Sequence, residues 1–238
     1  MNKDFFLNII FPRRCPVCGE ITEPPGSLIC RDCFQKLSFT SPPVCRSCGK
    51  EIPLSSDEYC RDCGKRKHSF ESGMALLNYD ETARRSMAGI KYGNRREYLD
   101  FYGAAMAARF RKRAEGMGAE ALVPVPVHPS RKKSRGFNQA EVLADRIGEQ
   151  LGIPVWPDLL VRRRKTRPQK DLTPGERLEN LRGAFEMNLP EGRRVPETVI
   201  LVDDIYTTGS TMEACAGILK QGGVKKVYFM AACITGGR

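Results

Sequence analysis

The chain has 238 residues, which is enough for one α/β domain and a smaller module. Its formal net charge of +11 favours an anionic partner. No run of 18 apolar residues exists, so neither a membrane-spanning helix nor membrane insertion is expected.

The N-terminal residues Met1–Pro12 are largely apolar. Two arginines follow them, and there is no small-residue cleavage site. They therefore predict a short helix docked on the rest of the protein rather than a secretory signal. We expect a cytoplasmic location, where the thiols of the ten cysteines stay reduced and bind metal instead of pairing.

Eight of the ten cysteines form two repeated units, and each cysteine of the second unit lies 30 residues after its counterpart in the first. The units are Cys15, Cys18, Cys30 and Cys33, and then Cys45, Cys48, Cys60 and Cys63. Two C-x2-C pairs per unit are typical of tetrahedral zinc, and this register disfavours the alternatives, disulfides or a redox pair. The spacing predicts two structural Zn²⁺ ions. It leaves open whether each ion takes its ligands within one unit or from alternate pairs.

A zinc-binding module is therefore expected over residues 1–68. Gly19 and Gly49 follow the first cysteine pair of each unit and suit the tight turn of a metal knuckle. His68 is a spare candidate ligand, but eight cysteines already fill two sites. Eight thiolates and two Zn²⁺ ions lower the formal charge to about +7, so most of the positive charge belongs to the second domain, residues 69–238.

Helices and strands alternate along this second domain. Apolar spacing and capping signals predict helices over 80–91, 97–114, 137–151 and 211–221, and another from Thr173 to Arg182. Apolar runs predict strands over 121–127, 159–162, 199–202 and 227–234, with a loop over 128–136. The prolines in 121–127 predict incomplete pairing of that strand. Cys215 and Cys233 are expected to be ordinary buried thiols. The alternation indicates an α/β fold, a parallel sheet flanked by helices.

The segment 199–211 carries the clearest chemistry. An apolar strand runs into Asp203 and Asp204, and open α/β sheets bind ligands at the carboxyl ends of their strands. The next residues offer hydroxyls and backbone N–H groups at a helix start, which suits a phosphate; they are Thr207, Thr208, Gly209, Ser210 and Thr211. Acceptors for hydroxyls thus stand beside donors for a phosphate, as a ribose 5-phosphate requires. The alternative is an acidic strand end followed by a capped helix without a ligand.

The same segment resembles the motif by which type I phosphoribosyltransferases bind 5-phosphoribosyl-1-diphosphate (PRPP). The resemblance implies that Asp203 and Asp204, the catalytic candidates, bond the ribose hydroxyls and that residues 207–211 wrap the 5-phosphate, with Mg²⁺ accompanying PRPP. It also implies that Ser134, Arg135 and Gly136 contact the pyrophosphate. A mobile loop with Arg167 and Gln169 would close over the ligand.

Three basic segments are further candidates for anion binding. Arg131, Lys132 and Lys133 form the first, and Arg162, Arg163, Arg164 and Lys165 form the second. The third, residues 91–96, contains Tyr92. Each segment is interpreted either as a solvated face or as part of a phosphate-binding track for single-stranded nucleic acid. In the second interpretation, Phe137 and Tyr206 would offer stacking faces.

The order of these motifs resembles the ComF family of competence-associated, phosphoribosyltransferase-like proteins over nearly the whole chain. The resemblance rests on the paired C-x2-C units, segments 91–93 and 135–140, Arg167 with Gln169, and the segment 199–211. It implies a cytoplasmic bacterial protein that handles single-stranded DNA during natural transformation, the uptake of DNA. A competence helicase or a DNA-uptake protein is the candidate partner.

Two functions from different classes follow. The first is a PRPP-binding protein whose zinc module and basic loops handle single-stranded DNA. The alternative is a Mg²⁺-dependent phosphoribosyltransferase that displaces pyrophosphate with a nucleobase or a related small acceptor. No hood with base-reading residues is recognisable, so we favour the first, and the residues leave the enzyme question open.

Overall fold

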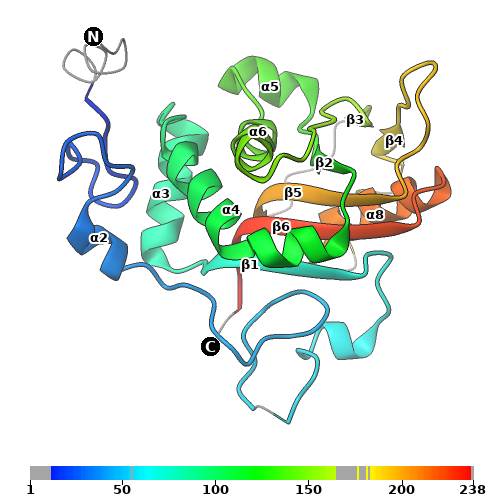
Figure 1. Ribbon diagram of the computed structural model, residues 1–238, viewed down its shortest axis with the longest axis horizontal. Coiled ribbons are helices and arrows are strands. Elements are labelled where there is room, and N and C mark those ends of the chain that lie inside the picture. The colour runs from blue at the N-terminus through cyan, green and yellow to red at the C-terminus, as the bar shows by residue number, and fades with distance from the viewer. Residues whose placement is uncertain (1–11, 55, 165–175, 177–180, 182, 237–238) are drawn as a thin grey trace.

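The computed structural model describes residues 12–54, 56–164, 176, 181 and 183–236 (Figure 1). The helices expected over Met1–Pro12 and from Thr173 to Arg182 lie almost entirely outside these residues. None of the described helices is long and apolar enough to cross a membrane.

A four-stranded parallel sheet in the order β1-β6-β5-β2 lies at the centre of the molecule (Figure 1). Its strands are β1 (Ser72–Asn78), β6 (Lys226–Ile234), β5 (Thr198–Tyr206) and β2 (Ala121–Pro124). Most of their side chains are buried, because both faces of a parallel sheet are covered. The predicted α/β fold is confirmed. β2 ends at Pro124, short of residue 127, which agrees with the incomplete pairing that its prolines predict.

Helices cover both faces of the sheet. The helices on one face are α3 (Glu81–Tyr92), α4 (Tyr98–Met117) and α6 (Gln139–Leu151), which bury Met87, Tyr102 and Ile147 in one cluster. The other face is covered by α8 (Ser210–Gln221) and the antiparallel pair of β3 (Leu160–Arg162) and β4 (Phe185–Met187). Alternate residues of β5 belong to the two clusters, Ile200 to the first and Leu201 to the second, as the pleat of a strand requires. Cys215 and Cys233 are fully buried, as predicted.

The strand β1 is missing from the sequence-based prediction. Its apolar core, Met74–Leu77, is short, and periodicity alone does not separate so short an apolar run from a piece of helix. The segment is a strand because it pairs in parallel with β6 along most of its length.

Two further segments correct the sequence-based prediction. Residues expected to form a loop contain helix α5 (Pro129–Arg135), because the His128 ring nitrogen accepts a hydrogen bond from the Ser130 N–H at 3.2 Å and Pro129 occupies the first turn. Strand β5 continues past Val202 to Tyr206, paired with β6. Asp203 and Asp204 therefore lie inside the last part of the strand instead of after it.

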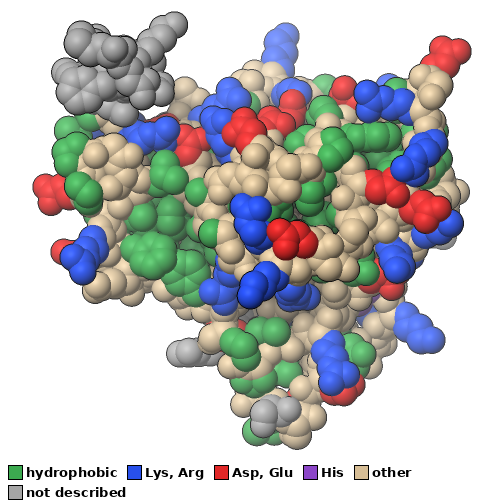
Figure 2. Space-filling model, viewed as in Figure 1, with side chains coloured by type: hydrophobic (Ala, Val, Ile, Leu, Met, Phe, Trp, Pro, Cys, Tyr) green, Lys and Arg blue, Asp and Glu red, His purple; other side chains and the backbone are tan. Residues whose placement is uncertain are grey.

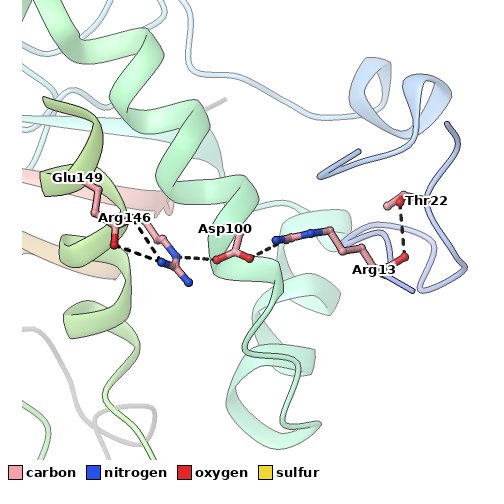
Figure 3. Close-up of polar contacts among 5 residues, drawn as sticks. All are labelled: Arg13, Thr22, Asp100, Arg146 and Glu149. Carbon is pink, nitrogen blue, oxygen red and sulfur yellow. Dashed lines mark hydrogen bonds and ion pairs between the residues drawn. The ribbon is translucent and has the colours of Figure 1, made fainter. Parts of the chain in front are cut away.

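The two cysteine units contact different parts of this fold (Figure 1). The first unit, with the short helix α2 (Arg31–Gln35), lies beside α4. Arg13 donates to Asp100 of α4 at 2.6 Å, and Asp100 also accepts from Arg146 of α6 at 2.7 Å (Figure 3). The second unit, which ends in the 3₁₀ turn η1 (Cys63–Lys65), packs against the opposite face of the sheet.

The segment between the units borders β1. Thr40 N–H donates to the Leu76 carbonyl at 3.0 Å, and Asn78 N–H donates to the Ser38 carbonyl at 2.8 Å. Phe39 forms an antiparallel bridge with Leu77. The edge of β1 that β6 does not occupy is therefore covered, which blocks edge-to-edge association at this strand.

Candidate functional site

The eight cysteines gather into two groups of four. Within each group, the sulfur atoms lie within 4.8 Å of one another, and each group contains the cysteines of one sequence unit. Cys48 Sγ and Cys60 Sγ are 3.7 Å apart, close to the edge of about 3.8 Å that a tetrahedron with Zn–S bonds of about 2.3 Å has. The residues therefore fit structural zinc, and the question left open by the spacing is answered: each site takes its ligands within one unit.

The knuckle glycines behave as predicted. Gly19 has a φ of 79° and Gly49 a φ of 76°, a region that disfavours side chains. Gly49 also lies against β1, because a Cβ there would be 2.9 Å from the Gly73 carbonyl oxygen. All four cysteines of the second site are buried, whereas Cys18 of the first is exposed. His68 belongs to neither group.

A cavity of about 300 Å³ opens beside the carboxyl end of β5. Seven of the residues assigned to PRPP or to the first two basic segments line it: Arg131, Arg135, Arg162, Asp203, Asp204, Thr207 and Thr211. Lining residues that sequence reasoning did not assign to this site include Tyr79, Lys91, Tyr92 and Gln139. Lys91 and Tyr92 belong to the third basic segment, and the sequence around that segment does not indicate that it lies next to β5.

The two carboxylates differ in their surroundings. Asp204 is buried and forms an ion pair with Lys91, with Oδ2 and Nζ 2.7 Å apart. Asp203 accepts a hydrogen bond from the Asp204 backbone N–H at 2.8 Å and has no such cation against it among the described ion pairs. Burial and the charge of Asp204 raise the pKa of Asp203 to about 8. Burial opposes the charge of Lys91, but contact with Asp204 outweighs it, so the pKa of Lys91 is raised.

The turn between β5 and α8, residues 207–211, is called the phosphate loop below. Gly209 has a φ of 78°, and a Cβ there would lie 2.3 Å from the Tyr206 hydroxyl, so no other residue fits this position without a shift. Thr208 Oγ1 and Ser210 Oγ lie 3.0 Å apart. The loop leads directly into α8, whose N-terminus has no side-chain cap, and the N-terminus of a helix favours an anion.

Three arginines, Arg131, Arg135 and Arg162, also line the cavity. Burial and the nearby charge of Arg131 lower the pKa of Arg162, so two like charges are held close together in the cavity lining. Arg135 donates to Gln139 Oε1 at 2.7 Å, while the buried Gln139 Nε2 has no partner among the described residues. An anionic ligand would neutralise these cations and could accept a hydrogen bond from the unpaired Gln139 amide.

Other predicted basic residues lie away from the cavity lining. Lys132 pairs with Glu141 at 2.9 Å and Arg163 with Glu186 at 3.0 Å. The remaining candidates Lys133, Ser134, Gly136 and Arg164 are exposed and do not line the cavity. Lys165, Arg167 and Gln169 lie outside the described residues.

The predicted stacking faces are wrong. Phe137 and Tyr206 are both buried, with Arg96 over the Phe137 ring and Phe229 stacked on Tyr206 at 4.8 Å between ring centroids. Their position next to basic residues in the sequence gave no information on which way the rings point. The exposed aromatic ring at the cavity is Tyr92, which is 83% exposed and has the Arg135 guanidinium 5.9 Å from its ring centroid.

The carboxylate environment predicts a pH effect on stability. A carboxyl whose pKa rises on folding contributes most below the pKa of unfolded aspartate, near 4, and loses that contribution as the pH rises toward 8. Asp203→Asn should therefore gain thermal stability over the parent protein between pH 5 and pH 8, by at least about 4 °C. Melting curves of both proteins across this range test it. Both share the same pH dependence of zinc binding, so a constant difference would contradict the raised pKa.

Comparison with known proteins adds two domain matches. A double zinc ribbon domain matches residues 6–64, and a phosphoribosyl transferase domain matches residues 133–237. Competence protein F of Haemophilus influenzae is 34% identical over 108 residues, which are 45% of this chain and 47% of that protein. DNA utilization protein YhgH of Escherichia coli K12 is 34% identical over 115 residues, 48% of this chain and 49% of that protein. Competence protein ComFC of Streptococcus pneumoniae is 32% identical over 106 residues, 44% of each. The chain thus spans about half the length of the curated relatives it matches.

Proposed function

We propose that this chain, which joins a double zinc ribbon to a phosphoribosyl transferase domain and resembles the competence proteins of the ComF family, binds PRPP with Mg²⁺ and handles single-stranded DNA. The names of its relatives, two competence proteins and a DNA utilization protein, support a role in DNA uptake. The cytoplasmic location is part of the proposal. The single observation that carries the PRPP site is the cavity beside β5.

That cavity combines three chemistries. Asp203 and Asp204 offer acceptors for the ribose hydroxyls, and the phosphate loop offers donors for the 5-phosphate. Arg131, Arg135 and Arg162 offer cations for a pyrophosphate, to which the arginine fork is well matched. Mg²⁺ is normally held by substrate phosphates together with one or two carboxylates, and the donor set here fits it. When bound, the ion would neutralise pyrophosphate charge.

The DNA-binding part of the proposal rests on the cations around this cavity and on Tyr92. A labelled single-stranded oligonucleotide, titrated with zinc-loaded protein at low and moderate salt, tests it by fluorescence anisotropy. Binding that falls steeply with salt is expected, because phosphate contacts release counterions. Repeating the titration with PRPP and Mg²⁺ shows whether the two ligands affect each other. No binding at low salt would contradict the DNA role.

Tyr92→Ala is expected to weaken single-stranded DNA binding about tenfold, because stacking of a base on an aromatic ring contributes about 1–3 kcal/mol. The matched control is Tyr59→Ala, since Tyr59 is also exposed, at 48%, but lies in the second zinc unit away from the cavity. The anisotropy assay measures both variants. Equal losses would show that exposed tyrosines act without regard to position and would remove Tyr92 from the binding track.

The second candidate function, phosphoribosyl transfer, is favoured by the same tyrosine. Tyr92 and Tyr79 line the cavity that holds the carboxylates, so a planar acceptor could stack beside the proposed ribose site. Release of pyrophosphate from PRPP and Mg²⁺, measured with each nucleobase in turn, tests this function. Release that no acceptor stimulates would favour the binding role over the enzyme.

The zinc module offers surface for a protein partner. Figure 2 shows hydrophobic side chains gathered over it, and the exposed ones include Ile21, Phe34, Leu54 and Tyr59. Ile21 and Phe34 belong to the first unit and Leu54 and Tyr59 to the second, so each unit offers its own candidate docking surface. A competence helicase or a DNA-uptake protein is the candidate, and co-purification with either one tests the contact.

A further inference from the structure

The segment that leaves the second zinc site reaches the phosphate loop. Cys63 is the last cysteine of that site, and the 3₁₀ turn η1 carries the chain from it to Arg66. The Arg66 guanidinium donates a hydrogen bond to the backbone carbonyl of Thr208, in the phosphate loop. Its Nε is buried without a partner among the described residues. Burying that nitrogen without a partner costs free energy, which the packing of Arg66 and its bond to Thr208 must offset.

The hydrogen bond to Thr208 orients the peptide group between Thr208 and Gly209. A peptide group is planar and trans, so its carbonyl and its N–H point to opposite sides. With the Thr208 carbonyl turned toward Arg66, the N–H of the same peptide, on Gly209, is turned away from the zinc module. That N–H belongs to the residue at the start of α8, where an anion would be bound.

The two following contacts hold the helix behind the loop. Ser69 donates to the Glu213 carboxylate through its backbone N–H at 3.1 Å and through its hydroxyl at 2.6 Å. His68 Nδ1 lies 3.0 Å from Glu213 Oε2. Glu213 is in the first turn of α8. Residues 66–69 therefore contact both the loop and the helix that begins from it.

Aromatic packing connects the same parts below the loop. Tyr206 stacks on Phe229, Phe229 meets Phe70 edge to face at 5.0 Å, and Phe70 stacks on His68 at 4.4 Å. The four cysteines of the second site lie in the same core cluster as Tyr206, whose hydroxyl closely underlies Gly209. The second zinc site and the phosphate loop thus share one packed core.

The first zinc site lacks these connections among the described residues. Its cysteines are outside that cluster, and its unit is joined to α4 through Arg13 and Asp100 (Figure 3). The two sites have the same ligands but differ in what they contact, so they provide an internal comparison.

We propose that Arg66 is a positioning residue, through which the second zinc site holds the phosphate loop in the shape that binds the 5-phosphate. PRPP binding and zinc retention at the second site then stabilise each other, and the first site stands apart. This inference rests on the proposed PRPP site.

Calorimetric titration of zinc-loaded full-length protein with PRPP and Mg²⁺ tests the role of Arg66. Arg66→Gln should weaken binding about tenfold while keeping both zinc ions and the parent melting temperature. Arg66→Lys should recover part of the affinity, because it keeps a cationic donor. The matched control, Arg13→Gln, removes an arginine of the first unit and should bind PRPP like the parent protein. Should Arg66→Gln fail to fold, Glu213→Gln tests the neighbouring contact with the same expected direction.

Zinc release to a chromophoric chelator tests the coupling in the other direction. PRPP with Mg²⁺ should slow zinc release from the second site severalfold and leave release from the first site unchanged. In Arg66→Gln, PRPP should no longer slow release from the second site. Full PRPP affinity in Arg66→Gln, or equal protection of both sites, would overturn the inference while leaving the PRPP site standing. A parent protein that binds no PRPP would instead refute the proposed function and this inference together.

Discussion

Replacing Asp203 and Asp204 together by asparagine is expected to weaken PRPP binding by at least about 100-fold. Hydrogen bonds to charged groups contribute about 1.5–3 kcal/mol each, so losing two corresponds to about 3 kcal/mol or more. The change also removes the charge that Lys91 Nζ contacts at 2.7 Å, leaving a half-buried cation without its partner. Calorimetric titration with PRPP at fixed Mg²⁺ measures the effect.

The control for this variant is Asp158→Asn, which changes an exposed carboxylate that does not line the cavity. It should bind PRPP like the parent protein. Circular dichroism and melting curves show whether the double variant is folded, which separates weak binding from unfolding. Intact PRPP affinity in a folded double variant would mean that the ribose hydroxyls are bound elsewhere.

Removing one ligand of the second zinc site should cause the largest loss of stability. Cys48→Ser is expected to lower the melting temperature by more than about 10 °C, because metal binding is part of the folding free energy of such modules. Cys48 is 1% exposed and lies in the core cluster that also contains Phe229 and Tyr206, so damage there reaches the sheet. Melting curves with zinc content by elemental analysis measure it.

Cys18→Ser is the matched variant at the first site. Cys18 is exposed, and its unit lies at the periphery beside α4, so the sheet should melt close to the parent temperature although one zinc ion is lost. Equal destabilisation by the two substitutions would show that both sites support the sheet to the same extent. That result would also weaken the case for coupling only the second site to the phosphate loop.

The sequence predicts those features whose residues lie close together along the chain. The C-x2-C pairs and the segment 199–211 each bring their chemistry within a few positions, so spacing alone indicates zinc and a phosphate-binding turn. Lys91 and Arg66 escape this reasoning, since their partners Asp204 and Thr208 are brought to them only by the folded sheet. Helix α5 was missed for a different reason: its cap is a histidine, a weaker signal than serine or aspartate.

The strand order determines when the sheet can assemble. β6 lies between β1 and β5, yet it is the last of the described strands along the chain. During synthesis, β1 and its flanking segment 38–40 emerge long before the strand that joins them to β5. The two halves of the sheet therefore remain separate until β6 inserts between them. Loss of β6 would divide the sheet at its centre, so deleting Lys226–Ile234 should be far more damaging than deleting an edge strand.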